Sequence, residues 1–299
     1  MYVARTFGLI ITDSAQLIYA IGERKRVKSV SHSMPKRFTG LSASWSTLFD
    51  TLMELPAILE QADKFNAQIM PGNDKAMMTE ATILAYMCQH LESSLGAWYS
   101  QLLQNEGDGV EDNLFWPEPS RLAEELPIDS PWRVYDAYLH FKNLEIGEML
   151  ILQWACLLLM LTLVRKQDKD VRTMTAASIS LYATDAARDS SNDKMYQLAT
   201  RITQSIEYCL YHGTGAAAIS FLGLPMNVAT GYFAPAKMEE MKWYALIFAR
   251  LQKINPGYAR IVQGMAEMGG GGMGFRAFIV QDPQAQKYAH SMEEADNCV

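Results

Sequence analysis

The stretch 143–165, NLEIGEMLILQWACLLLMLTLVR, is the most apolar part of the chain and decides its fold. From Met149 to Val164 only Gln153 and Thr162 interrupt a run of Met, Leu, Ile, Trp, Ala, Cys and Val. A helix that is apolar on all sides is either a membrane span or a helix surrounded by protein. A span requires about 18 nearly uncharged residues, whereas acids lie in the first turns here and bases follow the run. We therefore predict an all-α, multi-helix globular domain built around a central buried helix at residues 144–165.

Composition places the chain among globular proteins that do not hold nucleic acid by themselves. The 299 residues are 49% hydrophobic and 20% charged, which allows a substantial core. The 26 Lys plus Arg against 33 Asp plus Glu give a net charge of -7. A free-standing nucleic-acid binder needs a basic surplus to displace phosphate counterions. We therefore expect no direct nucleic-acid binding.

The cysteines and the N-terminus indicate an intracellular protein. Cys88, Cys156 and Cys209 fall inside apolar helical patterns, which is typical of reduced, buried thiols. The four cysteines form no CxxC or other metal-ligand spacing, so we expect neither a metal nor a cofactor. No clear cleavage site marks a signal peptide. The basic run 24–28 is either a weak nuclear signal or a solvated helix end, so the nucleus and the cytoplasm both stay open.

Hydrophobic spacing predicts helices along the chain and no convincing strand. Ser44 or Ser46 is expected to cap the helix that follows, and Pro56 is expected to kink or break it. Pro225 is expected to bend a Gly/Ala-rich helical segment over residues 213–235. Besides the central helix, the expected helices cover residues 5–24, 44–65, 76–104, 133–141, 170–187, 193–212, 237–254 and 256–268.

Residues 105–131 differ in character from the helical segments around them. An acidic, Gly-bearing stretch, NEGDGVEDN, precedes FWPEPSRLAEELPIDSPW, which contains four prolines. No long helix survives so many prolines, so we expect an ordered or semi-ordered crossing loop. Its aromatic and leucine side chains predict that the loop packs onto the domain.

The C-terminal glycines mark the end of the predicted domain. We expect one helical domain over residues 1–268 and a Gly-rich linker with a mobile tail over 269–299. GGGGMG satisfies GxGxxG, but it follows a helix rather than a strand, so it does not predict a nucleotide site. Another spaced pattern, Asp185, Asp189 and Asp193, crosses an expected helix boundary, where a capping and loop role is predicted.

Four polar residues are the candidates for catalysis, and two of them lie on the predicted central helix. Glu145 and Glu148 are three residues apart and hence on one helix face, where burial can shift a carboxyl pKa enough for acid–base work. Acids near a helix start are also favoured by the dipole and can simply be solvated. His140 and His212 could act as acids or bases, or serve as cap or core histidines. No HExxH, GxSxG or CxxC motif supports hydrolysis.

Several segments resemble, in the same order, the fungal-specific transcription-factor domain, a helical regulatory region that normally follows a binuclear zinc cluster. LFWPEPSRLAEELPIDSPWRVYDAYLHFKNLEIGEMLILQWACLLLMLTLV is similar to that family's proline-rich loop and the helix after it. WSTLFDTLMELPAILEQADKF, MYQLATRITQSIEYCL, FLGLPMNVATGYF and MKWYALIFARL resemble further segments of the family. The resemblance covers residues 40–255.

The resemblance implies an all-helical regulatory or ligand-binding protein, tied to secondary metabolism and acting through effector response, inhibitory contacts or dimerisation. The zinc-cluster cysteines are absent, so DNA binding by that module is not carried over. The chain is expected to start partway through the family domain. Glu145, Glu148, Gln153 and Met226–Asn227 depart from the family pattern. The expected partners are a hydrophobic small molecule and a homo- or hetero-oligomer, without a membrane.

The alternative is an enzyme that uses an apolar helical pocket to cyclise, isomerise or dehydrate a hydrophobic fungal metabolite. Such reactions need mainly shape, a few polarising groups and exclusion of water. A structure packed solid around Trp154 would argue against this alternative. The ligand-binding candidates are Gln153, Trp154, Tyr208, Met226, Asn227 and Trp243.

Overall fold

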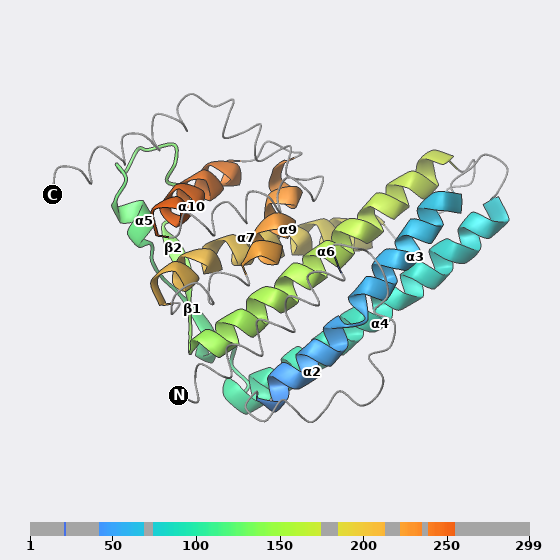
Figure 1. Cartoon of the computed structure of the whole chain (residues 1–299), viewed down its shortest axis with the longest axis horizontal. Helices are drawn as coiled ribbons and strands as arrows, with labels where there is room; N and C mark the ends of the chain where they lie inside the picture. Colours follow the sequence, from blue (N-terminus) through green and yellow to red (C-terminus); the bar gives the residue numbers. More distant parts are fainter. Residues whose placement is uncertain are drawn as a thin grey trace. The chain divides into compact units, whose positions relative to one another are not determined.

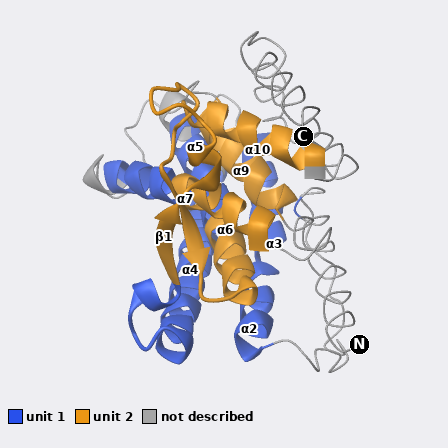
Figure 2. Ribbon diagram, turned by 90° about the vertical axis from the view of Figure 1, so that its left-hand side faces the viewer, with its two compact units in different colours: residues 1–114, 156–198 blue, residues 115–155, 199–299 orange. Residues whose placement is uncertain are grey.

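The computed structural model describes residues 21, 42–68, 74–174, 185–212, 222–234 and 239–254. These ranges are predominantly helical and contain one two-stranded antiparallel sheet (Figure 1). The predicted all-α class with a central buried helix is confirmed. The chain divides into two compact units, and each unit consists of two segments that are separated in the sequence (Figure 2). Unit 1 comprises residues 1–114 and 156–198, and unit 2 comprises residues 115–155 and 199–299.

Some predictions fall on residues outside the described ranges. These are the helices at 5–24 and 256–268, the basic run 24–28 and the tail at 269–299. The single domain over residues 1–268 also stays a prediction.

Unit 1 contains α2 (Ala43–Leu52), α3 (Leu55–Gln68) and α4 (Asp74–Glu106), and α4 contacts both other helices (Figure 1). Pro56 lies in the first turn of α3, where a missing N–H removes no helical hydrogen bond. The predicted break at Pro56 and the long helix at 76–104 are therefore confirmed.

Ser42 caps α2, because its hydroxyl accepts a hydrogen bond from the Trp45 amide at 3.3 Å. The predicted caps Ser44 and Ser46 are wrong, since both residues lie within α2. The carbonyl of Ser44 instead accepts a hydrogen bond from the Trp98 indole at 2.8 Å, which joins α2 to α4.

The helix α6 (Leu144–Met174) is the predicted central helix. Asn143 precedes it and accepts a hydrogen bond from the Ile146 amide at 2.9 Å. Among the described residues, α6 is the one helix long and apolar enough to cross a membrane by length and composition, with a mean hydropathy of 1.9. However, 89% of its apolar window is buried within the protein, as in a core helix. It continues past the predicted end at residue 165 because the following Lys, Gln and Arg residues favour helix.

The helix α7 (Asp185–His212) is continuous. The helix boundary and the capping role predicted at Asp189 and Asp193 are therefore wrong, whereas Asp185 is the first described residue of α7 and its predicted role is not tested. Asp189 and Asp193 are exposed one turn apart, so both carboxylates stay in water without interrupting the helix. Residues 175–184 lie outside the described ranges.

The sheet of unit 2 was not predicted from the sequence. Its strands are β1 (Phe115–Pro119) and β2 (Ala137–Phe141), with the short helix α5 (Arg121–Glu124) between them. The helix predicted at 133–141 is therefore wrong, and the crossing loop contains both a strand and a helix. Prolines are tolerated in β1 because both strands of a two-stranded sheet are edges. The packing predicted for this segment is confirmed, since Phe115, Leu122, Leu126 and Trp132 are buried.

Two further helices of unit 2 contact each other: α9 (Gly223–Phe233) and α10 (Glu240–Ile254). Pro225 lies in the first turn of α9, where its missing N–H removes no helical hydrogen bond. Residues 213–221 lie outside the described ranges, so the bend predicted in the segment 213–235 stays a prediction. The helix predicted at 237–254 is confirmed over the range of α10.

Phe141 lies at the centre of an aromatic core in unit 2. The centroid of its ring lies 6.0 Å from that of Phe115, 6.1 Å from that of Trp154 and 5.1 Å from that of Tyr208. Gly147 lets α6 approach this ring, because a Cβ built there would meet Phe141 Cδ2 at 3.1 Å.

The substitution Gly147→Ala tests this close approach. Alanine is favoured over glycine in a helix by about 1 kcal/mol, but the confined Phe141 ring cannot yield easily. We expect a net loss of about 1–2 kcal/mol in the free energy of unfolding, measured by urea titration. In the control Gly231→Ala no atom lies within 4 Å of the new Cβ. That variant should gain about 0.5–1 kcal/mol, and equal gains in both variants would contradict the close packing.

Candidate functional site

Two histidines and two aromatic residues meet in unit 2. The His140 ring, on β2, stacks on Trp116 with centroids 4.9 Å apart and meets Tyr208 edge-on at 5.0 Å. His212, at the end of α7, stacks on Tyr208 at 4.7 Å and lies edge-on to His140 at 4.9 Å. Tyr208 and His212 are four residues apart and hence share one helix face. These four rings are called the histidine cluster below.

The carboxylate of Glu118 joins the histidine cluster from β1. Its Oε2 accepts a hydrogen bond from the Tyr138 hydroxyl at 2.8 Å and lies 3.3 Å from His140 Nδ1. Its Oε1 accepts a hydrogen bond from the Trp116 indole at 3.0 Å. The cross-strand pairs Glu118–Tyr138 and Trp116–His140 lie on one face of the sheet because side chains alternate along a strand.

The surroundings determine the charge state of these groups. Hydrogen bonds, that from Tyr138 first, lower the pKa of Glu118. Burial, followed by the charges of His140 and Arg121, lowers the pKa of His212. Near neutral pH the cluster therefore contains an anionic Glu118 and a neutral His212.

A second carboxyl lies close to the same cluster, inside the protein. Glu148 on α6 is only 6% exposed. Burial, and secondly the charge of Glu145, raises the pKa of Glu148 to about 7. Burial, then the charges of Cys209 and Glu148, raise the pKa of Tyr208 to about 12. The Tyr208 ring lies against α6 at Gly147, where a Cβ would meet Tyr208 Cε1 at 3.4 Å, and Glu148 is the next residue of the helix. This carboxyl can exchange a proton near neutral pH.

Two of the four catalytic candidates contact Tyr208. His140 and His212 contact its ring, and Glu148 follows Gly147, the residue of α6 that lies against the same ring. Glu145 is exposed, so the two acids of the expected pair differ in environment despite their spacing of three. Tyr208 and the two histidines could bind a polar or aromatic ligand, and a histidine could exchange a proton with it.

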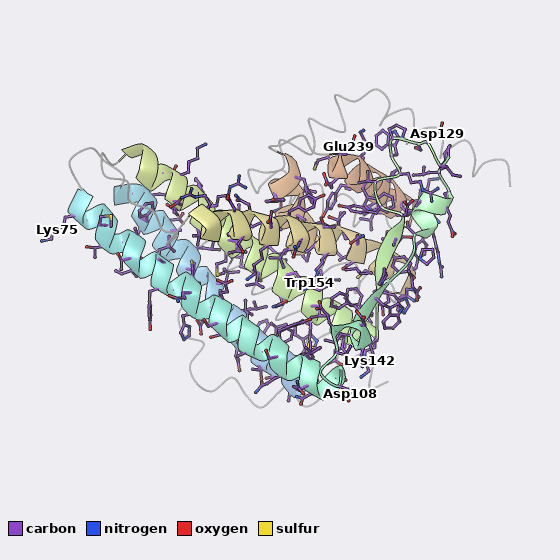
Figure 3. All side chains as sticks on the ribbon, turned by 180° about the vertical axis from the view of Figure 1, so that it is seen from behind. Lys75, Asp108, Asp129, Lys142, Trp154 and Glu239 are labelled. Atoms are coloured by element: carbon purple, nitrogen blue, oxygen red, sulfur yellow. The ribbon has the colours of Figure 1, made fainter. Side chains whose placement is uncertain are left out.

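Two further candidates, Gln153 and Trp154, lie in the core rather than at an open surface. Trp154 on α6, labelled in Figure 3, is 2% exposed and lies edge-on to Phe115 at 5.3 Å. Phe141 and the Arg201 guanidinium also lie against its ring. Gln153 is equally buried, and its Oε1 finds no hydrogen-bond partner within the described part of the chain.

The remaining ligand candidates lie apart from the histidine cluster in sequence and contacts. Met226 and Asn227 are on α9, the first buried and the second half-buried. Trp243 on α10 is fully buried and lies edge-on to Tyr135 at 5.6 Å. Over the described ranges, no ring contact or hydrogen bond joins these three residues to the histidine cluster.

The sequence analysis missed Trp116, Glu118 and Tyr138. In WPE and in YLH two side chains that can form hydrogen bonds flank one that cannot, which is the period of two of a strand face. In the first of these segments the prolines concealed the strand. Within the described ranges, no group of three or more His, Cys, Asp or Glu side chains could hold a metal ion.

The chain matches no protein-family model, no curated protein and no solved structure. The site is therefore described from its own residues.

The substitution Glu148→Gln tests the burial of this carboxyl. Its pKa is raised in the folded protein, so folding binds a proton and stability falls as pH rises from the unfolded value through about 7. At pH 8 the variant should therefore exceed the wild type by up to about 3 kcal/mol in the free energy of unfolding. At pH 5 the gain should largely disappear in urea titrations.

Glu145→Gln is the matched control, because this acid lies one turn earlier and is exposed. It should change the pH dependence only slightly. A Glu148→Gln variant whose stability relative to the wild type is the same at pH 5 and pH 8 would show that Glu148 is solvated.

Proposed function

We propose that the chain is a helical regulatory or ligand-binding module of the kind found in fungal transcription factors, tied to secondary metabolism and without DNA binding of its own. It binds a hydrophobic small molecule and does no chemistry on it.

One contact carries this proposal. Two of the segments that resemble the family, FWPEPSRLAEELPIDSPWRV and SIEYCL, are hydrogen-bonded to each other. Ser120 in the first donates to Glu207 Oε2 in the second at 2.7 Å, and the Leu122 amide donates to Glu207 Oε1 at 3.2 Å. Each segment therefore supplies hydrogen-bond partners for buried polar groups of the other. This is a physical reason for both segments to occur in the same chain.

The surroundings of α6 favour binding over catalysis. Trp154 is in contact with Phe115, Phe141 and Arg201, and almost none of its surface faces a space that water could enter. The carboxylate oxygens of Glu118 accept hydrogen bonds from the Tyr138 hydroxyl and the Trp116 indole. These polar groups therefore stabilise the fold, and the exposed edge of the histidine cluster, at His212, is the part left to contact a ligand.

The alternative is a cofactor-independent cyclase, isomerase or dehydratase. One observation favours it: His140 and His212 contact Tyr208, and Glu148, on the helix that lies against the same ring at Gly147, has a pKa raised to about 7. A carboxyl with a pKa near the working pH is suited to acid–base catalysis.

Ser120→Ala tests the contact between the two segments. The variant removes the cap of α5 and one donor to the buried Glu207, so we expect a loss of about 1–3 kcal/mol in the free energy of unfolding. Ser130→Ala is the matched control, because the hydroxyl of this half-buried serine accepts a hydrogen bond from the amide of Trp132, two residues away, at 3.3 Å. Equal losses would show that the contact adds no stability.

Native mass spectrometry with a fungal metabolite extract separates the two functions. If the protein is regulatory, each chain should retain one unchanged small molecule. The wild type and the Glu148→Gln variant should retain it equally well. Chromatography of the extract should show no new product over time. The result that would establish the enzyme has two parts. The wild type would convert an extract component to a product of equal mass, or lighter by one water, and a folded Glu148→Gln variant would not.

A further inference from the structure

Arg121 presents an unpaired guanidinium on the surface of the described part of unit 2. It is exposed at the start of α5, and its guanidinium carbon lies 4.9 Å from the centroid of the Tyr211 ring. This cation–π contact holds the planar group against α7. Glu124 and Glu125 follow at the spacing of helical ion pairs, but Glu125 pairs with Arg250 instead. Among the described residues, no hydrogen bond or ion pair engages the five N–H groups of the Arg121 guanidinium.

Arg250 of α10 approaches the same short helix (Figure 1). Its Nη2 lies 3.7 Å from Glu125 Oε1, which is beyond hydrogen-bond distance. Burial raises the pKa of the Tyr211 phenol, and the charges of Arg250 and Arg121 oppose this rise. Both arginines therefore act on the same phenol.

Tyr211 and His212, at the end of α7, add two further donors. The Tyr211 hydroxyl is buried and finds no hydrogen-bond partner in the described ranges, which is uncommon for a buried polar atom. His212 is exposed, and its ring is held by stacking on Tyr208 at 4.7 Å. Near neutral pH His212 is neutral, with one ring N–H to donate. Arg121, Tyr211, His212 and Arg250 are called the donor site below.

The donor site is rich in N–H and O–H groups, which suits a ligand with anionic oxygen atoms. We propose that it binds the carboxylate of an organic acid, with the Arg121 guanidinium as the main contact. The flat fork of N–H groups in this side chain matches two carboxylate oxygens in a bidentate pair. The apolar body of the acid then lies at the exposed edge of the histidine cluster, beside His212. This inference rests on the proposed ligand-binding function and names the chemical class of the ligand.

The acids around the donor site favour a carboxylate over a phosphate. Glu124 and Glu125 are exposed on α5, and the partly exposed Glu118 lies at the histidine cluster. A phosphate monoester carries a charge of about −1.5 to −2 near neutral pH, whereas a carboxylate carries a single negative charge. Repulsion from these acids therefore disfavours the phosphate more than the carboxylate.

NMR titration of the full chain with benzoate, benzamide and phenyl phosphate tests the donor site, because these probes share one ring and differ in charge. The ring proton signals of His212, assigned by their loss in His212→Gln, report binding there. Near neutral pH, benzoate should bind at least about tenfold more tightly than benzamide, as expected for hydrogen bonds to a charged group. Phenyl phosphate should bind more weakly than benzoate.

The substitution Arg121→Gln should weaken benzoate binding at least about tenfold and leave benzamide binding unchanged. Arg133→Gln is the matched control, because this arginine belongs to the same unit and its Nε already lies 2.5 Å from Asp136 Oδ1. The control should leave benzoate binding unchanged. Thermal unfolding followed by circular dichroism verifies that both variants fold.

Equal binding of benzoate and benzamide would overturn the inference, and so would equal losses in the two arginine variants. Stronger binding of phenyl phosphate than of benzoate would contradict the assignment to a carboxylate. Benzoate that leaves the His212 signals unchanged at millimolar concentration would overturn the donor site itself. None of these results decides whether the chain retains a hydrophobic molecule from the extract, so the proposed function stands or falls separately.

Discussion

The structure depends on the need to keep one long apolar helix out of water. Almost every residue of α6 from Met149 to Leu158 is buried, and exposing such a run would cost about 25 cal/mol for each Å² of apolar surface. Both compact units use this helix, since residues 144–155 belong to unit 2 and residues 156–174 to unit 1. Of the most apolar window of this helix, 89% is buried.

Two buried acids near α6 are compensated in different ways. Glu207 accepts hydrogen bonds from Ser120 and from the Leu122 amide. Burial, and then the charge of Glu145, raises the pKa of Glu148 to about 7, so a proton offsets the cost of burying its charge. The histidine cluster is arranged differently, because its rings stack and Glu118 holds one side of it. A binding role at the exposed edge of this cluster is compatible with a solid interior.

The sequence predicted the helices because their apolar periodicity is long and strong, as in α4, α6 and α10. It also predicted Glu148, His140, His212 and Tyr208 as site residues. In the structure the rings of both histidines contact Tyr208, and Glu148 follows Gly147, where α6 lies against the Tyr208 ring. The strands could not be predicted in the same way. β1 is five residues long and contains two prolines, and it pairs with β2 through residues that are 18 to 26 positions apart in the sequence. Trp116, Glu118 and Tyr138 were missed for that reason.

Hydrogen exchange along α6 tests the central claim most directly. The claim is that this helix is the buried core of the protein. Amide exchange from Leu150 to Leu163 should then be the slowest in the molecule, and it should become fast only when the whole protein unfolds. Amides in that segment that exchange as fast as those at the exposed start of α2 would contradict the account.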